Sequence, residues 1–177
     1  TAWQWTWFVP HDVDGLVELM GGRDAFIGKL DSLFVADSSL EGESVSVDIS
    51  GLIGQYAHGN EPSHHIAHLY NYVGQPYKTQ ALVDSVLHTL YFNEPNGLSG
   101  NEDCGQMSAW YVLNAMGFYQ VCPGKPVYSI GRPLFDEAAI RLQNGNTFTI
   151  ITHNNSRDNK YVRKIILNGE ELAAPFF

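Results

Sequence analysis

A short polar loop near the middle of the chain is the strongest candidate for chemistry. Asn101, Glu102 and Asp103 stand side by side between two glycines, directly before a stretch with helical apolar spacing. A carboxylate held in such a loop could act as a general base or bind a hard cation. The plain alternative is that Asp103 caps the following helix and its neighbours are solvated. The residue types alone favour this alternative.

A second polar turn, Gly59-Asn60-Glu61-Pro62, also precedes a predicted helix. Asn60 and Glu61 offer oxygen ligands, which suit calcium better than zinc. The loop pattern of an EF-hand is absent, so a calcium site would have to be assembled from segments distant in the sequence.

Histidines follow this turn at a spacing known from zinc enzymes. His64 and His68 would stand one helical turn apart, as do the two zinc ligands of many metalloproteases. The general-base Glu of that motif is replaced here by His65, so the motif fails at its central residue. We therefore favour helix histidines that are hydrogen-bonded at a polar cleft.

Aromatic residues crowd the first stretch of the chain, where Trp3 and two further tryptophans precede His11 and Asp12. Aromatic faces stack on sugar rings, and His and Asp side chains can bond sugar hydroxyls. Equally, the tryptophans could fill core volume at the start of a strand or helix, and composition does not separate the two.

The composition limits the fold and the partners. The chain has 177 residues, which suits one domain, and 44% of them are apolar, which excludes wholesale disorder. The net charge of −9 argues against nucleic acid or an anionic membrane as the main partner and is compatible with a cation site. No apolar run is long enough to span a membrane. Few charges and many aromatic residues suit neutral polar ligands such as sugars.

Helical spacing dominates the first two-thirds of the chain. Asp12 is a good N-cap for the first helix, and Gly117 is placed to end the last. The predicted helices cover 13–20, 25–34, 61–72, 77–90 and 106–116. Residues 36–52 are weakly patterned and could form a strand or a loop.

Strand-like alternation takes over after Tyr119. The predicted strands are 127–130, 147–151 and 161–167, with a turn at Asn168-Gly169. The fold class is therefore mainly α with a β C-terminal third.

The cysteines and the chain ends give two further expectations. Cys104 and Cys122 flank the last predicted helix, beyond disulfide reach, so we expect free, buried thiols. Both ends of the chain are apolar, which predicts a piece cut from a larger protein.

Taken together, these stretches resemble glycoside hydrolase family 92, the calcium-dependent α-mannosidases found mostly in bacteria. The resemblance is carried by the run Gly100-Asn101-Glu102-Asp103-Cys104-Gly105-Gln106-Met107-Ser108-Ala109-Trp110-Tyr111-Val112-Leu113, with Gly117-Phe118-Tyr119 after it. Three further segments, 2–12, 59–70 and 128–135, resemble the family in the same order, so the match covers nearly the whole chain.

The resemblance implies a fold. Residues 1–118 would be the helical, latter part of an (α/α)6-barrel catalytic domain, and 119–177 a β-rich C-terminal segment. The family's N-terminal β-sandwich domain is absent from this sequence. The remaining domains of the parent enzyme are therefore expected partners at the active site.

The resemblance also implies a reaction, the inverting hydrolysis of α-mannosides in an exo manner. Asp103 matches the general base, and Asn101 stands where other members carry Asp, a departure that concerns water positioning. Glu102 would contact sugar or support the loop, and Trp3, His11 and Asp12 match a segment near the sugar. Asn60 and Glu61 match the segment that helps hold Ca²⁺.

The general-acid Glu of the family would lie just upstream of Thr1, so this chain alone is expected to be inactive. The expected substrates are mannose-containing glycans, including N-glycans, with a preference for α-1,2 linkages. The family also implies export to the periplasm or the cell surface.

Two other functions remain open from the residues. One is a non-catalytic carbohydrate-binding module, which would keep the cleft without the chemistry. The other, which we rank far behind, is a zinc metalloprotease built on His64 and His68.

Overall fold

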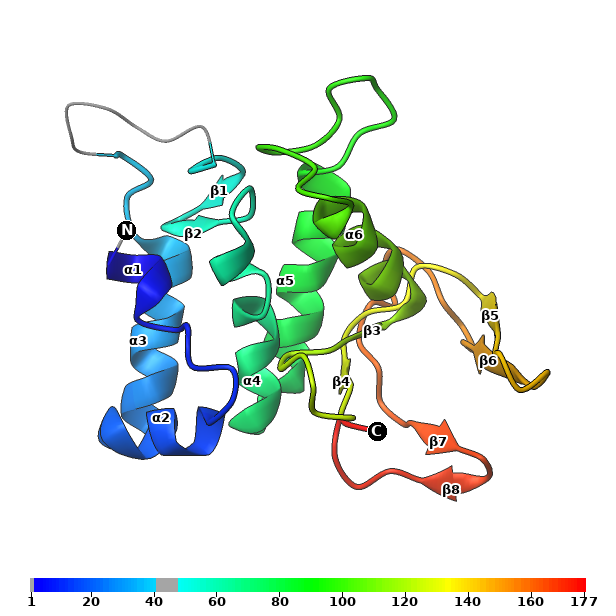
Figure 1. Cartoon of the computed structure of the whole chain (residues 1–177). Coiled ribbons are helices and arrows are strands. Elements are labelled where there is room, and N and C mark those ends of the chain that lie inside the picture. The colour runs from blue at the N-terminus through cyan, green and yellow to red at the C-terminus, as the bar shows by residue number, and fades with distance from the viewer. Residues whose placement is uncertain (1, 41–47) are drawn as a thin grey trace.

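The computed structural model describes residues 2–40 and 48–177, and its helices gather in the first two-thirds of the chain (Figure 1). The helical elements are α1 Ala2–Trp5, α2 Val13–Leu19, α3 Arg23–Val35, the 3₁₀ turns η1 Glu61–Ser63 and η2 Ile66–His68, α4 Leu69–Tyr72, α5 Pro76–Thr89 and α6 Gln106–Met116.

Local capping explains where several helices begin and end. The Asp12 carboxylate accepts a hydrogen bond from the Gly15 N–H at 3.0 Å and starts α2, as predicted. Helix α5 starts at Pro76, whose missing N–H is tolerated in a first turn. Helix α6 ends at Gly117, which adopts a left-handed conformation with φ 102°. These boundaries confirm the sequence predictions.

The predicted continuous helix over 61–72 is wrong, because this stretch forms η1, η2 and α4 in succession. The His64 ring bonds the carbonyl of His58 and the His65 ring bonds the carbonyl of Trp7. Contacts with other segments therefore determine the conformation of this stretch, which does not form a regular α-helix.

The strands form small antiparallel pairs. They are β1 Leu52–Ile53 with β2 Tyr56–Ala57, β3 Phe118–Tyr119 with β4 Ser129–Ile130, β5 Glu137–Arg141 with β6 Thr147–Ile151, and β7 Ile166–Leu167 with β8 Glu170–Glu171. The predicted mixture of a helical part and a β C-terminal third is confirmed at this level.

Two of the predicted strands are shorter than expected. Only Ile166–Leu167 of the stretch 161–167 is paired, because the Val162 N–H donates to the Gln80 side chain on α5. The Asn168-Gly169 turn is confirmed, with positive φ at both residues as a tight hairpin needs.

The sequence patterns missed some β-structure and left one segment open. Strand β5 was not predicted. Tyr128 exchanges backbone hydrogen bonds with Phe177 at the C-terminus. Within the weakly patterned stretch 36–52, residues 41–47 lie outside the described part of the chain, and β1 begins at Leu52.

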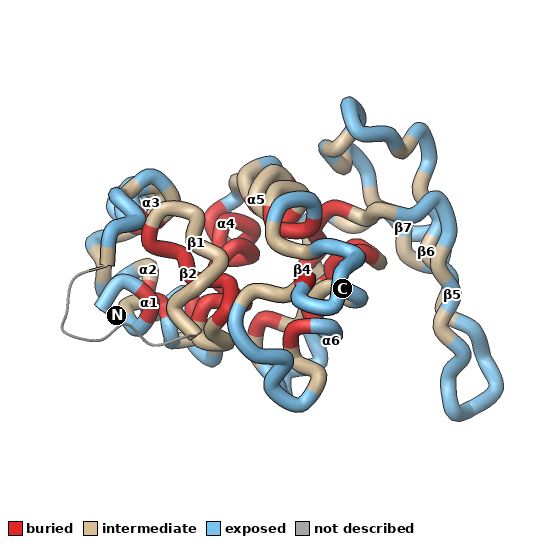
Figure 2. Tube along the Cα trace, turned by 90° about the horizontal axis from the view of Figure 1, so that it is seen from above, coloured by how far each residue is buried: buried red, intermediate tan, exposed pale blue. Residues whose placement is uncertain are grey.

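The main core lies in the helical part, as Figure 2 shows by the buried residues gathered there. Its largest fully buried side chains include Trp7, Phe26, Tyr56, Tyr70 and Trp110. The hairpins of the C-terminal third are largely exposed. The helical part can therefore hold its side chains in fixed positions, which a site requires.

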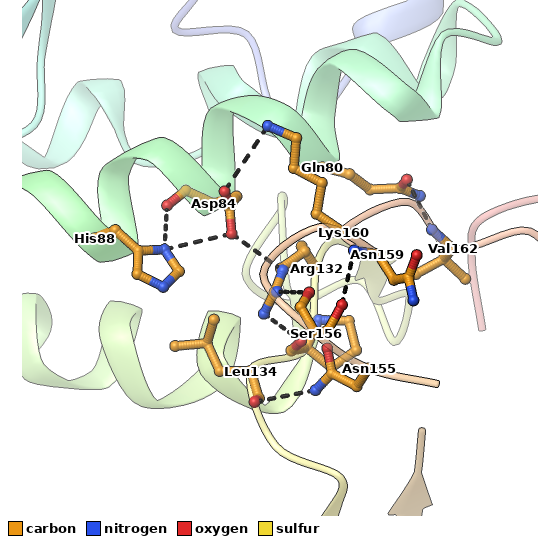
Figure 3. A network of polar contacts seen from close by, with 11 residues as sticks. Gln80, Asp84, His88, Arg132, Leu134, Asn155, Ser156, Asn159, Lys160 and Val162 are labelled. Atoms are coloured by element: carbon orange, nitrogen blue, oxygen red, sulfur yellow. Dashed lines mark hydrogen bonds and ion pairs between the residues drawn. The ribbon is translucent and has the colours of Figure 1, made fainter. Parts of the chain in front are cut away.

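A buried ion pair fastens the C-terminal third to α5 (Figure 3). The Arg132 guanidinium is 5% exposed and its Nε lies 3.1 Å from Oδ1 of Asp84. Its two terminal nitrogens donate to the carbonyls of Pro133 and Ser156, each at 2.9 Å. One side chain thus joins helix α5 to the loop that follows β6.

Two smaller expectations are settled by the structure. Both cysteines are free, as predicted, but Cys104 is exposed and Cys122 only half-buried. The predicted burial is wrong for Cys104 because it lies in the loop before α6. Among the described residues, no helix is long and apolar enough to cross a membrane.

Candidate active site

Two glycine-containing turns pack directly against each other. The first is Gly59-Asn60-Glu61-Pro62, and the second is the loop from Gly100 to Gly105. A Cβ on Gly100 would lie only 2.7 Å from the Gly59 carbonyl oxygen, so neither turn could approach the other with a larger residue there. The Asn101 amide nitrogen donates to Oδ1 of Asp48 at 2.9 Å and ties the second turn to the segment before β1. The two polar motifs singled out in the sequence therefore form one site.

This packing brings together two carboxylates, Glu61 of η1 and Asp103 of the loop before α6. Their side chains share a hydrogen bond, which is the main cause of a raised pKa for Asp103. Loss of hydration and the negative charges of Glu61 and Glu102 also raise this pKa. A carboxylate with a raised pKa accepts a proton more readily near neutral pH, as a general base must.

The backbone at Asp103 has an unusual conformation. Asp103 and Cys104 are consecutive non-glycine residues with φ of 50° and 56°, in the left-handed region. Such residues are energetically unfavourable unless the surroundings hold them, and they cluster at functional sites. The conformation is thus consistent with a loop built to present one side chain.

Glu102 holds this loop on helix α6. Its carboxylate accepts hydrogen bonds from the Ser108 N–H at 2.9 Å and the Ser108 hydroxyl at 2.8 Å. The N-cap residue, Gly105, has no side chain for this role. The structure thus gives Glu102 a loop-supporting contact, one of the two roles expected for it, while a sugar contact stays a prediction.

Buried, neutral histidines lie behind the carboxylates. His64 Nε2 donates to the His58 carbonyl oxygen at 2.9 Å, which leaves Nδ1 to accept from the Gln106 amide at 3.0 Å. Burial lowers the pKa of His64 to about 4 and that of His58 to about 2. Both rings are therefore neutral at pH 7.

The partners of His58 fix its ring as well. Tyr91 donates to the Met107 carbonyl at 3.1 Å, so it accepts from His58 Nε2 at 2.6 Å. The Tyr56 hydroxyl then donates to Nδ1 at 2.8 Å. His58 is a structural core residue that the sequence reasoning did not single out.

The zinc hypothesis for His64 and His68 is not supported by their contacts. His68 bonds the Ser129 hydroxyl at 3.0 Å and the Asn114 amide oxygen at 2.9 Å, so its two ring nitrogens are occupied away from His64. Within residues 2–40 and 48–177, no group of three His, Cys, Asp or Glu side chains is placed to hold a metal ion.

Oxygen-bearing side chains dominate the turn that carries Glu61. Glu61 and the half-buried Asn60 beside it supply a carboxylate and an amide oxygen. Calcium takes about six to eight oxygen ligands, so these two residues fit the ion in kind and would provide part of its shell.

The aromatic N-terminal segment is divided between this site and a distant position. Helix α1 places Trp3 36% exposed, and the buried Gln4 beside it donates to the Ser63 hydroxyl of η1 at 3.4 Å. The site residues that the sequence reasoning missed, Gln4 and Gln106, both lie inside the family-like motifs but carry no charge to draw attention.

His11 and Asp12 are not brought to the carboxylate pair. Both are exposed, and the Asp12 carboxylate is used to cap α2. Figure 1 shows α2 at the opposite end of the helical part from the loop that leads into α6. Their expected sugar contacts therefore have no support from the arrangement within this chain.

Comparisons with known proteins agree on one family. The glycosyl hydrolase family 92 catalytic domain matches residues 1–177. An uncharacterized secreted glycosidase of Arthroderma benhamiae is 31% identical over 172 residues, covering 96% of this chain and 20% of that protein.

Solved structures give the same result. A GH92 alpha-mannosidase of Bacteroides thetaiotaomicron, in complex with mannoimidazole, is 40% identical with a TM-score of 0.92, covering 100% of this chain and 23% of that one. An inverting GH92 mannosidase of the same organism is 43% identical with a TM-score of 0.83, covering 100% of this chain and 25% of that one. This chain thus spans between 20% and 25% of the length of these relatives.

Proposed function

The chain belongs to glycosyl hydrolase family 92, and on that premise we propose that it supplies the general base of an inverting α-mannosidase. The observation that carries the proposal is the meeting of Glu61 and Asp103, which two turns distant in the sequence bring together by packing directly against each other. The solved relatives support it, since they are named alpha-mannosidase and inverting mannosidase.

Inversion needs one carboxylic acid to protonate the leaving oxygen and one carboxylate to activate water on the opposite face of the sugar. We assign the second role to Asp103, which would accept a proton from water as the water attacks the anomeric carbon. The general acid would be a Glu upstream of Thr1 in the parent enzyme. Asn101, held by Asp48, would help to orient the loop and the water.

The resemblance also points to calcium, with Asn60 and Glu61 among its ligands. A bound calcium ion would engage sugar hydroxyls and favour distortion of the ring. Glu61 lies next to Asp103, so the same turn would serve both sugar positioning and the base. Trp3, on the helix that packs against η1, would offer a ring face to the sugar.

The finer features of the parent enzyme follow the family. We propose that this chain is the latter part of an (α/α)6-barrel and that the remaining domains of the enzyme complete the pocket. Mannose-containing glycans with α-1,2 linkages, N-glycans among them, are the proposed substrates. We also propose export to the periplasm or the cell surface, and the name of the secreted fungal relative supports export in general.

Hydrolysis of α-1,2-mannobiose by the intact parent polypeptide tests the proposal, with calcium and then with EDTA. We expect activity that EDTA abolishes and calcium restores. The Asp103→Asn variant should lose ~10²–10⁴-fold in kcat, the usual contribution of a general base. Asp158→Asn, an exposed residue of the C-terminal third, is the matched control and should behave as wild type.

The other outcomes discriminate the alternatives. Binding of mannosides without hydrolysis of any linkage would favour a carbohydrate-binding module. Activity that persists in EDTA would contradict the calcium site alone, and an active Asp103→Asn variant would contradict the assigned base.

A further inference from the structure

Glu61 and Asp103 lie on separate segments of the chain. The backbone carbonyl of each accepts a hydrogen bond from the residue three positions later. The His64 N–H donates to the Glu61 carbonyl at 3.0 Å, and the Gln106 N–H donates to the Asp103 carbonyl at 3.1 Å. The side chains of these two residues then meet, with Gln106 Nε2 donating to His64 Nδ1 at 3.0 Å. We call this contact the His64–Gln106 bridge.

We propose that the His64–Gln106 bridge is a positioning contact that fixes the separation between Glu61 and Asp103. It joins the turn of η1 to the first turn of α6 beneath the carboxylates. This inference rests on the proposed function, in which Asp103 is the base. Neither His64 nor Gln106 is assigned a direct contact with substrate.

The bridge is anchored firmly at its histidine end. His64 is 2% exposed, and its Nε2–H is held by the His58 carbonyl at 2.9 Å. Its own carbonyl accepts from the Trp110 indole N–H at 3.0 Å, inside the core. The ring therefore cannot turn without leaving buried polar groups unpaired, which is costly.

The glutamine end is held too. Besides His64, the Gln106 amide nitrogen reaches the Tyr119 hydroxyl at 3.3 Å. Gln106 is also the first residue of α6, so its backbone moves with that helix. Movement of η1 relative to α6 would break the bridge, and the bridge therefore resists such movement.

The two ring nitrogens can be tested separately with a matched pair of variants. In His64→Asn the amide oxygen occupies the place of Nδ1 and keeps an acceptor for Gln106. In His64→Gln the amide occupies the place of Nε2, which keeps the donor to His58 and loses the acceptor. Both remove the same buried ring, and His64→Asn also gives up the donor to the His58 carbonyl, so a purely structural role would not make His64→Gln the more damaging variant.

We expect kcat of the intact enzyme to fall about 100-fold in His64→Gln, since a misplacement of about 1 Å has that effect. KM should change little, and His64→Asn should retain most of kcat. Gln106→Met, which keeps the volume and loses the donor, should match His64→Gln and serves if that variant fails to fold. His153→Gln, at an exposed histidine, controls for the substitution itself.

Crystal structures of the same variants give a readout that does not need turnover. The separation between the Glu61 and Asp103 carboxylates should increase in His64→Gln and Gln106→Met and stay unchanged in His64→Asn. An unchanged carboxylate pair in all three variants would overturn the bridge, as would equal kcat values for the two His64 variants. An inactive wild type with the expected increase in separation would instead contradict the proposed function and leave the bridge standing.

Discussion

At the residue scale, the buried histidines are the feature that the tertiary structure explains best. Asn71 donates to the Ser129 hydroxyl at 2.7 Å, Ser129 donates to His68 Nδ1, and His68 Nε2 donates to Asn114. Asn114 in turn donates to the Trp110 carbonyl at 2.9 Å. The His68 ring keeps both of these hydrogen bonds only while it is neutral, because a protonated ring could not accept from Ser129.

Stability should therefore fall in mild acid. Burial lowers the pKa of His68 and His64 to about 4, below the ordinary value of 6.5 expected on unfolding. Below pH 6.5 the unfolded state binds more protons than the folded state, so the stabilisation is complete above that pH and is lost toward pH 4. Each such histidine contributes a slope of up to ~1.4 kcal/mol per pH unit.

Denaturant titrations of the intact polypeptide between pH 7 and 5.5 would measure this slope while most carboxylates stay charged. His153→Gln, at an exposed histidine, should leave the slope unchanged. A free energy of unfolding that is constant over this range would contradict the buried, neutral assignment.

At the element scale, the site depends on how closely two turns approach. Gly100 has φ +72° and its missing Cβ leaves room for the Gly59 carbonyl, while Gly59 itself lies against Ser50 and Ser99. Larger side chains at this contact would push η1 away from the loop before α6. The small size of Gly59 and Gly100 therefore helps to set the positions of the Glu61 and Asp103 carboxylates.

Gly100→Ala in the intact enzyme should lower both stability and kcat. The added Cβ would lie 2.7 Å from a backbone oxygen that cannot easily move, in addition to ~1–2 kcal/mol for an L-residue at positive φ. Gly124→Ala isolates the second effect, because Gly124 has φ +90° and nothing within 4 Å of the added Cβ. Thermal unfolding and mannoside kinetics compare the two. Equal losses of stability and activity would show that the close approach of the turns is unimportant.

At the scale of the whole molecule, polar contacts join the exposed C-terminal hairpins to the helical core. Arg132 is the central one, since it bonds Asp84 of α5 and the Ser156 carbonyl together (Figure 3). Lys160 also approaches the Asp84 carboxylate, at 4.0 Å. The ion pair is mostly buried, so removal of the Arg132 side chain would leave the charged Asp84 carboxylate with poor access to water.

Arg132→Met should destabilise the protein by ~3 kcal/mol, the low end for breaking a buried pair, because Lys160 partly compensates the Asp84 charge. Hydrogen exchange should become faster around Val162. Lys164→Met is the matched control, since it breaks an ion pair with Glu171 whose side chains are 57% and 62% exposed. Lys164→Met should lower the free energy of unfolding by less than ~1 kcal/mol. Similar exchange in both variants would contradict the role given to Arg132.

Sequence and structure agree best where the information is local. Helices α2, α3, α5 and α6 were predicted because apolar spacing, caps and glycines lie within a few residues of one another. The family could be recognised for a similar reason, since the run from Gly100 to Leu113 is continuous in the chain. The sequence by itself therefore determined these four helices, the family and Asp103 as the candidate base.

Only the tertiary structure decided which motif residues meet. Glu61 lies beside Asp103, whereas Asp12 caps a distant helix although it stands in an equally family-like motif. The bridge between His64 and Gln106 has no counterpart in local spacing. Partners far apart in the sequence are chosen by packing of the whole core, which places a buried polar side chain where its hydrogen bonds can be satisfied.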